Sequence, residues 1–200
     1  MKTRLSLVML LLLMLFATSA YSEESNPTQS DFKRFMWGAT LEEVVNFEGT
    51  YLASDKVNGK DDTVIIYRTT AVGLDVILGY YFCDDGLYQV VYSLDEEHTN
   101  GESYINDYEK FRDALTKKYG KPLFDRIKWN DNSMKEYYQE NRKSQGDALT
   151  YGYCSYSTGY QTDRSLIAMS MNSDNYEIST TIVYRSTVID SGEADYSDEI

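Results

Sequence analysis

His98 is the only histidine of the chain, so acid–base or metal chemistry that needs an imidazole would have to use it. It lies in the acidic stretch DEEHTNG, where a solvated surface role is the simplest interpretation. The sequence does not indicate a serine catalytic triad, because no serine lies in a Gly-x-Ser-x-Gly motif. A thiol enzyme would need Cys83 or Cys154 beside His98, and their tyrosine and apolar neighbours disfavour a thiolate. The residues therefore predict no catalytic set.

Paired carboxylates are frequent and occur at Asp61-Asp62, Asp84-Asp85 and Glu96-Glu97. A glycosidase would need two of them about 5–9.5 Å apart across a sugar, which a sequence does not fix. Asp84-Asp85 is better explained as a hairpin turn, because Asp85-Gly86 between two alternating runs is a strong hairpin signal. DEEHTNGES superficially resembles a calcium loop, but Asn100 stands where the glycine is required. We expect no metal and no cofactor.

The two cysteines, Cys83 and Cys154, are 71 positions apart and both fall in apparent strands. In an exported chain they would form a disulfide, which the sequence slightly favours, and two buried free thiols are the alternative.

Tyrosine is the compositional outlier, with 19 residues. In the predicted strand 149–160, Tyr151 and Tyr153 share one face, whereas Tyr156 and Tyr160 share the other with Cys154. An exposed row of tyrosines is a good surface for a protein or a glycan, so these four are the predicted binding residues. The alternative is that they cover a half-buried sheet with their hydroxyls in water.

The N-terminus carries an export signal. Lys2 and Arg4 precede the apolar block LSLVMLLLLMLFA, and the small residues of TSAYS offer cleavage after Ala20 or Ser22. An anchor helix is the alternative, although a membrane span needs about 20 apolar residues. Removal of residues 1–22 changes the net charge from −13 to −15, since it takes away two basic residues and no acidic ones. We expect a periplasmic or secreted chain without a membrane span, and such a charge excludes nucleic acid as a partner.

Two segments have helix signals. In FMWGATLEEVVNFEG, Thr40 and Glu43 form a capping box and Gly49 is the stop. Gly38 is placed at the sharp turn before the helix, and Trp37 is expected to fold over its apolar side. The second helix, within 104–122, has apolar residues at helical spacing and ends at Gly120 and Pro122. Residues 123–148 fit either a short helix capped by Asn132 or Ser133 or an exposed loop.

About seven strands complete the chain, with a weak one at TYLAS and clear period-two segments at 63–71, 76–83, 87–94, 149–160, 165–172 and 176–184. Short connections make neighbours antiparallel. The predicted class is therefore α+β, with two or three helices packed on one face of an antiparallel sheet. We expect a flexible lead-in over 23–34, one domain over 35–186, and a disordered acidic tail over 187–200. The element order also fits two halves, 35–100 and 101–186, each a helix followed by a meander.

WGATLEEVVNFEG resembles the Trp-Gly-x-(Ser/Thr)-x-Glu-Glu-Val helix start of small exported bacterial proteins of unassigned function. In that family a second signature, similar to YEKFRDALTKKYGKP, follows a meander. The spacing of Gly38, Thr40, Val44 and Gly49 is also similar to the helix start of outer-membrane assembly lipoproteins and of beta-lactamase inhibitor proteins. Those families use helices packed on an antiparallel sheet to bind proteins. The resemblance implies this fold and assigns no residue a role.

These observations predict an exported, non-enzymatic module that binds another protein of the cell envelope through a tyrosine-rich sheet face. A small-ligand or carbohydrate-binding protein is the second hypothesis, and an envelope hydrolase is the third.

Overall fold

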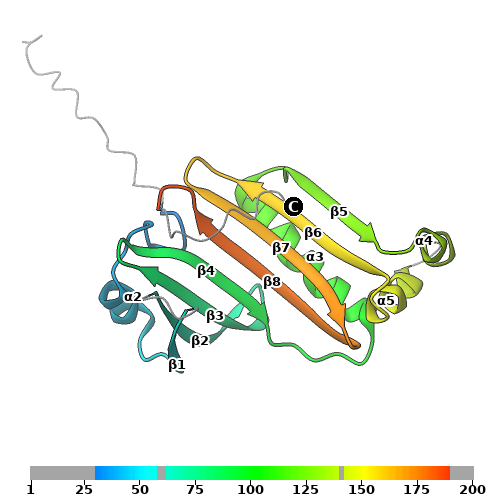
Figure 1. The fold of residues 1–200 in the computed structure, drawn as a ribbon, viewed down its shortest axis with the longest axis horizontal. Helices are drawn as coiled ribbons and strands as arrows, with labels where there is room; N and C mark the ends of the chain where they lie inside the picture. The colour runs from blue at the N-terminus through cyan, green and yellow to red at the C-terminus, as the bar shows by residue number, and fades with distance from the viewer. Residues whose placement is uncertain (1–29, 58–61, 140–141, 190–200) are drawn as a thin grey trace, which may run out of the picture.

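The computed structural model describes residues 30–57, 62–139 and 142–189 (Figure 1). The predicted signal peptide, residues 23–29 of the predicted lead-in and residues 190–200 of the predicted tail lie outside this part of the chain.

One antiparallel sheet organises the described residues. Its spatial order is β1-β2-β3-β4-β8-β7-β6-β5, and every neighbouring pair is antiparallel. The strands are β1 (Ala53–Lys56), β2 (Thr63–Ala71), β3 (Leu74–Cys83), β4 (Gly86–Leu94), β5 (Phe124–Trp129), β6 (Cys154–Gln161), β7 (Ser165–Asp174) and β8 (Glu177–Ser186). The α+β class with an antiparallel sheet is confirmed. The described residues form eight strands, one more than predicted. The missed strand is β5, which lies at the edge of the sheet and has the charged sequence FDRIKW instead of an alternating apolar pattern.

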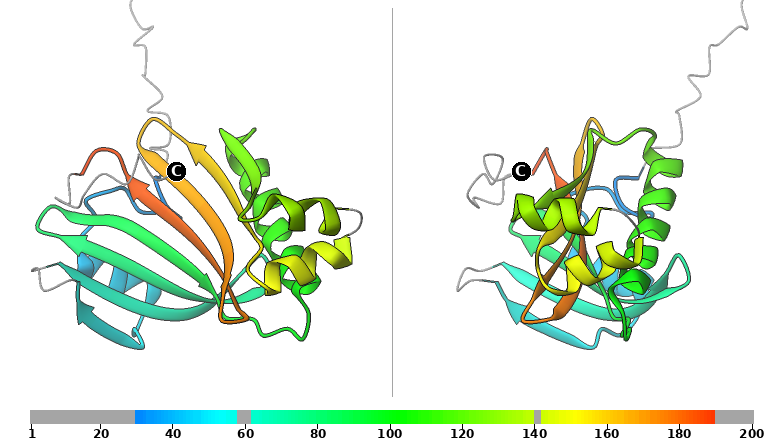
Figure 2. Two further views of the ribbon diagram at one scale, coloured as in Figure 1. Left: turned by 45° about the vertical axis from the view of Figure 1, so that its right-hand side comes forward. Right: turned by 90° about the vertical axis from the view of Figure 1, so that its right-hand side faces the viewer.

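Four helices are described, which are α2 (Leu41–Glu48), α3 (Gly101–Tyr119), α4 (Asn132–Tyr138) and α5 (Arg142–Thr150). Helices α2 and α3 lie over one face of the sheet, whereas α4 and α5 lie at its far end beside β5 and β6 (Figures 1 and 2). Helix α4 begins after Asp131, whose carboxylate accepts from the backbone N–H groups of Ser133 and Met134, so the predicted cap at Asn132 or Ser133 was wrong. Helix α5 was not predicted, and β6 begins at Cys154 rather than at residue 149.

The two halves have the same order of elements. A helix is followed by four strands in each half, and the halves meet where β4 pairs with β8, in a register centred on Val91 and Val183. Both leading helices end at a glycine with nearly the same backbone angles, φ 87° and ψ −153° at Gly49 and φ 81° and ψ −156° at Gly120. Only glycine populates this region well. The main difference is residues 130–153, which join β5 to β6 and contain α4 and α5, whereas only residues 57–62 join β1 to β2.

The predicted start of the first helix is confirmed in its capping box. Thr40 Oγ1 accepts from the backbone N–H of Glu43 at 3.2 Å, and the Glu43 carboxylate accepts from the backbone N–H of Thr40 at 2.7 Å. The orientation of Trp37 differs from the prediction. Its indole Nε1–H donates to Ser165 Oγ on β7 at 2.9 Å, so Trp37 ties the start of α2 to the second half.

Residues 30–34 were predicted to be a flexible lead-in, and this prediction was wrong. Phe32 and Phe35 form a β-bridge, and both rings are buried in the core. The Phe32 ring lies 4.9 Å from that of Tyr184 and 5.7 Å from that of Tyr92, measured between centroids. Asp31 fixes this turn, because its carboxylate accepts from the Trp37 backbone N–H at 2.8 Å and from Arg164 at 3.0 Å. The segment was not recognised as part of the core because polar residues surround the two phenylalanines in the sequence.

Phe32→Ala should lower the free energy of unfolding by about 3–5 kcal/mol, because it removes a ring that is 3% exposed and leaves a cavity over β4 and β8. Phe47→Ala is the matched control, since that ring is 47% exposed, and it should cost less than about 1 kcal/mol. Urea unfolding of chains expressed from residue 23 measures both. Equal losses would contradict a core role for this segment.

Candidate functional site

The predicted binding tyrosines divide between the core and the surface. Tyr156 and Tyr160 project from β6 towards the helices and are buried, so they are not available to a partner, and this part of the prediction was wrong. Tyr160 donates its hydroxyl to the Arg112 carbonyl at 3.1 Å and lies 2.9 Å from Thr116 Oγ1. The physical reason is the alternation of β6, whose even-numbered side chains face the core.

Tyr151 and Tyr153 precede β6 and lie in a cluster of five neighbouring rings, which we call the tyrosine ridge and which consists of Tyr137, Tyr138, Tyr151, Tyr153 and Tyr176. Successive centroids are 4.8 Å apart from Tyr137 to Tyr138, 5.9 Å to Tyr153, 6.1 Å to Tyr151 and 6.0 Å to Tyr176. The exposed fractions of Tyr137, Tyr151 and Tyr176 are 72%, 55% and 71%. Rings from α4, the α5–β6 turn and the β7–β8 turn thus form one aromatic cluster, in which Tyr137, Tyr151 and Tyr176 are exposed while Tyr138 and Tyr153 pack partly against the core.

The segment that carries four of these rings is anchored to the rest of the fold. Ala148 and Leu149 of α5 are buried, and the helix meets α3 where Gly146 lies against Gly101. A Cβ on Gly101 would come within 2.0 Å of the Gly146 carbonyl oxygen, so the two helices approach as closely as only glycines permit. Ser173 Oγ of β7 also donates to the Thr150 carbonyl at 2.9 Å. The turn that carries Tyr151 and Tyr153 therefore follows a helix that is packed against the core.

Tyr176 occupies a backbone position that favours glycine. Asn175 and Tyr176 join β7 to β8 with φ values of 50° and 70°, and two positive φ values are the requirement of a type I′ hairpin turn. The β2–β3 turn has the same pattern at Val72 and Gly73, with φ values of 49° and 79°, and it has glycine in the second position. An exposed tyrosine at this position is unfavourable for the backbone.

Within the ridge, the hydroxyl of Tyr138 has a pKa above its ordinary value. Burial raises the pKa of Tyr138, and nearby Tyr153, Tyr137 and Tyr151 and the negative charge of Asp147 raise it further. A phenol whose pKa is raised above its ordinary value keeps its proton up to a higher pH. Tyr138 therefore contributes an aromatic ring and a hydroxyl group without phenolate charge.

His98 has a structural role rather than the predicted solvated one. Its Nε2 lies 2.5 Å from Asp107 Oδ2, and Lys110 Nζ donates to the other oxygen of this buried carboxylate at 2.8 Å. The Tyr104 ring lies 4.8 Å from the imidazole and its hydroxyl accepts from the His98 backbone N–H. The group fastens the loop after β4 to α3.

The predicted disulfide is absent, because Cys83 and Cys154 are both free. Cys83 ends β3 and its thiol donates to the Gly86 carbonyl at 3.7 Å, whereas Cys154 begins β6 and is buried. Burial raises the pKa of Cys154 to about 12, and burial is also the main cause of the raised pKa of Cys83. The raised pKa values favour the protonated form of both thiols.

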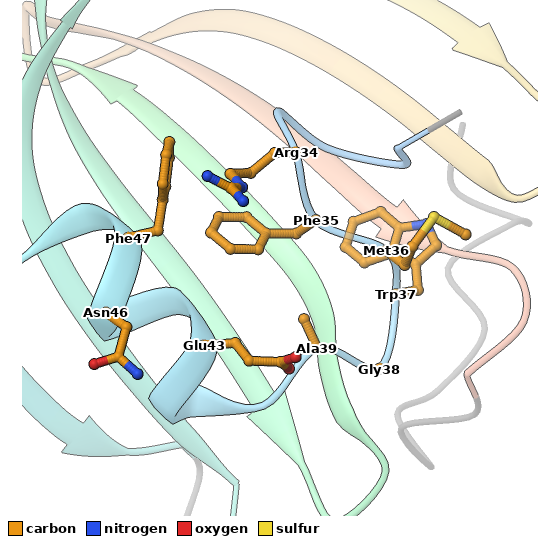
Figure 3. Close-up of a pocket in the computed structure, with 9 residues that line it drawn as sticks. All are labelled: Arg34, Phe35, Met36, Trp37, Gly38, Ala39, Glu43, Asn46 and Phe47. Carbon is orange, nitrogen blue, oxygen red and sulfur yellow. The ribbon is translucent and has the colours of Figure 1, made fainter. Parts of the chain in front are cut away.

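A separate hollow of about 640 Å³ lies between residues 34–39 and α2 (Figure 3). Trp37 and Glu43 line it together with Phe35, Phe47 and Arg34, and His98 does not. The Arg34 guanidinium lies over the Phe47 ring at 4.7 Å from its centroid. The Glu43 carboxylate accepts both hydrogen bonds that Thr40 donates, which lowers its pKa, so its role here is to cap α2.

The chain matches no protein-family model, no curated protein and no solved structure. None of the helices in residues 30–57, 62–139 and 142–189 has the length and apolarity needed to cross a bilayer. Within the same ranges, no three side chains of His, Cys, Asp or Glu are grouped so that they could hold a metal ion.

Three ridge residues, Tyr137, Tyr138 and Tyr176, were missed from the sequence. Tyr137 and Tyr138 lie in the segment that fitted helix or loop equally well, and Tyr176 was placed inside the last strand. The dipeptide Asn175-Tyr176 between two alternating runs was the available signal for a turn.

The state of the cysteines can be checked by counting thiols. The denatured chain, prepared without reductant, should yield two thiols. In the native chain at pH 8 Cys154 should not react within the time in which a model thiol does, because a pKa of about 12 leaves about one ten-thousandth of it as thiolate. A yield of no thiols would restore the disulfide.

Tyr176→Gly should raise the free energy of unfolding by about 0.5–1 kcal/mol, because glycine relieves the positive φ at the turn. Gly73→Tyr is the matched reverse change. No atom lies within 4 Å of a Cβ built on Gly73, so its loss of about 1–2 kcal/mol would come from the backbone. Urea midpoints measure both. If Tyr176→Gly destabilises as much as Gly73→Tyr, the tyrosine serves the fold.

Proposed function

We propose that this protein is an exported, non-enzymatic binding module that recognises another protein of the cell envelope through the tyrosine ridge. The observation that carries the proposal is the exposure of Tyr176 at a turn position where glycine would suit the fold better. Backbone strain of this kind clusters at functional sites, which supports a role for the Tyr176 side chain in binding.

The chemistry of the ridge suits a protein partner. Tyrosine presents a large, rigid surface with a hydroxyl at its tip and loses little conformational entropy on binding, which is why it is common at protein interfaces. Four of the five ridge residues lie between β5 and β6, on an anchored segment added to the regular pattern of the two halves. Binding residues on a loop that a rigid scaffold holds are a frequent arrangement.

The ring geometry favours a protein over a glycan. Three of the four neighbouring pairs are inclined, by 83° at Tyr137–Tyr138, 46° at Tyr151–Tyr153 and 84° at Tyr151–Tyr176. The half-buried pair Tyr138–Tyr153 is stacked, with an angle of 29° between the rings. A sugar ring makes its apolar contact with the flat face of an aromatic ring, and rings so inclined do not form one flat platform. An irregular protein surface can use both their edges and their faces.

Export supports the choice of an envelope partner. The charged start, the apolar block and the small residues of positions 1–22 are typical of a secretory signal, and the proposed location is the periplasm or the medium. The net charge of −13 before its removal would repel nucleic acid and anionic membrane surfaces.

Site-specific photo-crosslinking tests the proposal. A photoreactive phenylalanine at position 176, in the full chain exported by its own host, should capture one defined protein, and an excess of unlabelled chain should compete. The matched control places the same group at Tyr51, an exposed tyrosine outside the ridge, and should not capture that protein. Equal capture at both positions, or none at position 176, would contradict the proposal.

A further inference from the structure

We infer that the ridge binds a partner segment rich in arginine and lysine, whose cations lie on the outer ring faces between flanking carboxylates. This inference rests on the proposed function and assigns a chemical class to its partner. Two observations support it, which are the carboxylates around the ridge and the ridge rings on which no lysine or arginine of the described residues lies.

The carboxylates around the ridge are exposed. Asp174 and Glu177 pair across the β7–β8 turn on either side of Tyr176, Glu136 precedes Tyr137 on α4, and Asp147 acts electrostatically on Tyr138. Residues 130–153 and 172–178 together hold six acidic and three basic residues, a net charge of −3. The residues around the ridge thus share the negative charge of the protein as a whole, and that field attracts cations.

Cations elsewhere in the chain already lie on aromatic rings. Among the described residues the four cation–π contacts use the rings of Phe32, Phe47, Tyr119 and Phe124, and no ridge ring receives one. Tyr137 and Tyr176, the two most exposed rings of the ridge, therefore present faces that an external guanidinium or ammonium can cover. Arginine suits this surface best, because its planar group stacks on a ring while its N–H groups reach a carboxylate.

Fluorescence anisotropy of labelled peptides tests the inference. The probe is an acetylated peptide of alternating glycine and arginine, and the reference replaces each arginine by citrulline, which keeps the shape and lacks the charge. At physiological ionic strength the unmodified protein should bind the arginine peptide at least ten-fold more tightly than the citrulline peptide.

Variants separate the ridge from the general field of the protein. Tyr137→Ala with Tyr176→Ala should weaken arginine-peptide binding at least five-fold, while the corresponding change of both residues to Phe should keep it within two-fold. Tyr51→Ala is the control and should have no effect. Asp174→Asn with Glu177→Gln should also weaken binding, although all rings remain. Circular dichroism checks that each variant is folded.

Two results would overturn the inference. If the double variant Tyr137→Ala, Tyr176→Ala binds the arginine peptide as tightly as the unmodified protein does, the peptide is attracted by the overall negative charge of the protein and not by the ridge. If citrulline and arginine peptides bind equally, charge is not recognised. Either result leaves the proposed function open to its own test, because crosslinking at position 176 does not depend on the charge of the partner.

Discussion

The pairing of β4 with β8 is the contact on which the rest of the structure depends. It joins two four-stranded meanders into one sheet, and it sets Val90 beside Tyr184 and Tyr92 beside Ile182 on the face that the helices cover. Without it neither meander would have a complete core, because the rings of Phe32 and Tyr92 lie against Tyr184 of the other half. The Trp37–Ser165 and Asp31–Arg164 contacts brace the same junction from the N-terminal side.

Tyrosine serves two purposes in this protein, and burial decides which. In the core its hydroxyl needs a partner, and Tyr80 donates to Glu48 while Tyr108 lies 2.6 Å from Thr158 Oγ1. Burial raises the pKa of these phenols, so the core holds neutral hydrogen bonds rather than phenolate charge. In the ridge the same side chain is held by ring contacts, with its hydroxyl accessible. A count of tyrosines does not distinguish the two environments.

Sequence patterns that span only a few residues were sufficient to predict much of the fold, but they did not predict the full set of residues of the tyrosine ridge. The capping box of α2, the hairpin turn at Asp84-Asp85 and the apolar spacing of α3 each act within a few residues, and each was predictable. The surface position of Tyr151 and the burial of Tyr156 depend on where β6 begins, and that start is set by α5, whose contact with Gly101 is distant in sequence. The core position of Phe32 likewise depends on Arg164, far along the chain. Contacts of this kind leave no periodic pattern.

The unequal connections of the two halves bear on how such a protein can diversify. Residues 130–153 occupy the place that six residues occupy in the other half, and they join the scaffold mainly through α5, by the buried Ala148 and Leu149, the close contact with α3 and the hydrogen bond from Ser173. Replacement of this insert during evolution would exchange one recognition surface for another while both meanders stayed intact. Descendants of one ancestral scaffold would then be alike in their strands and unlike in what they capture.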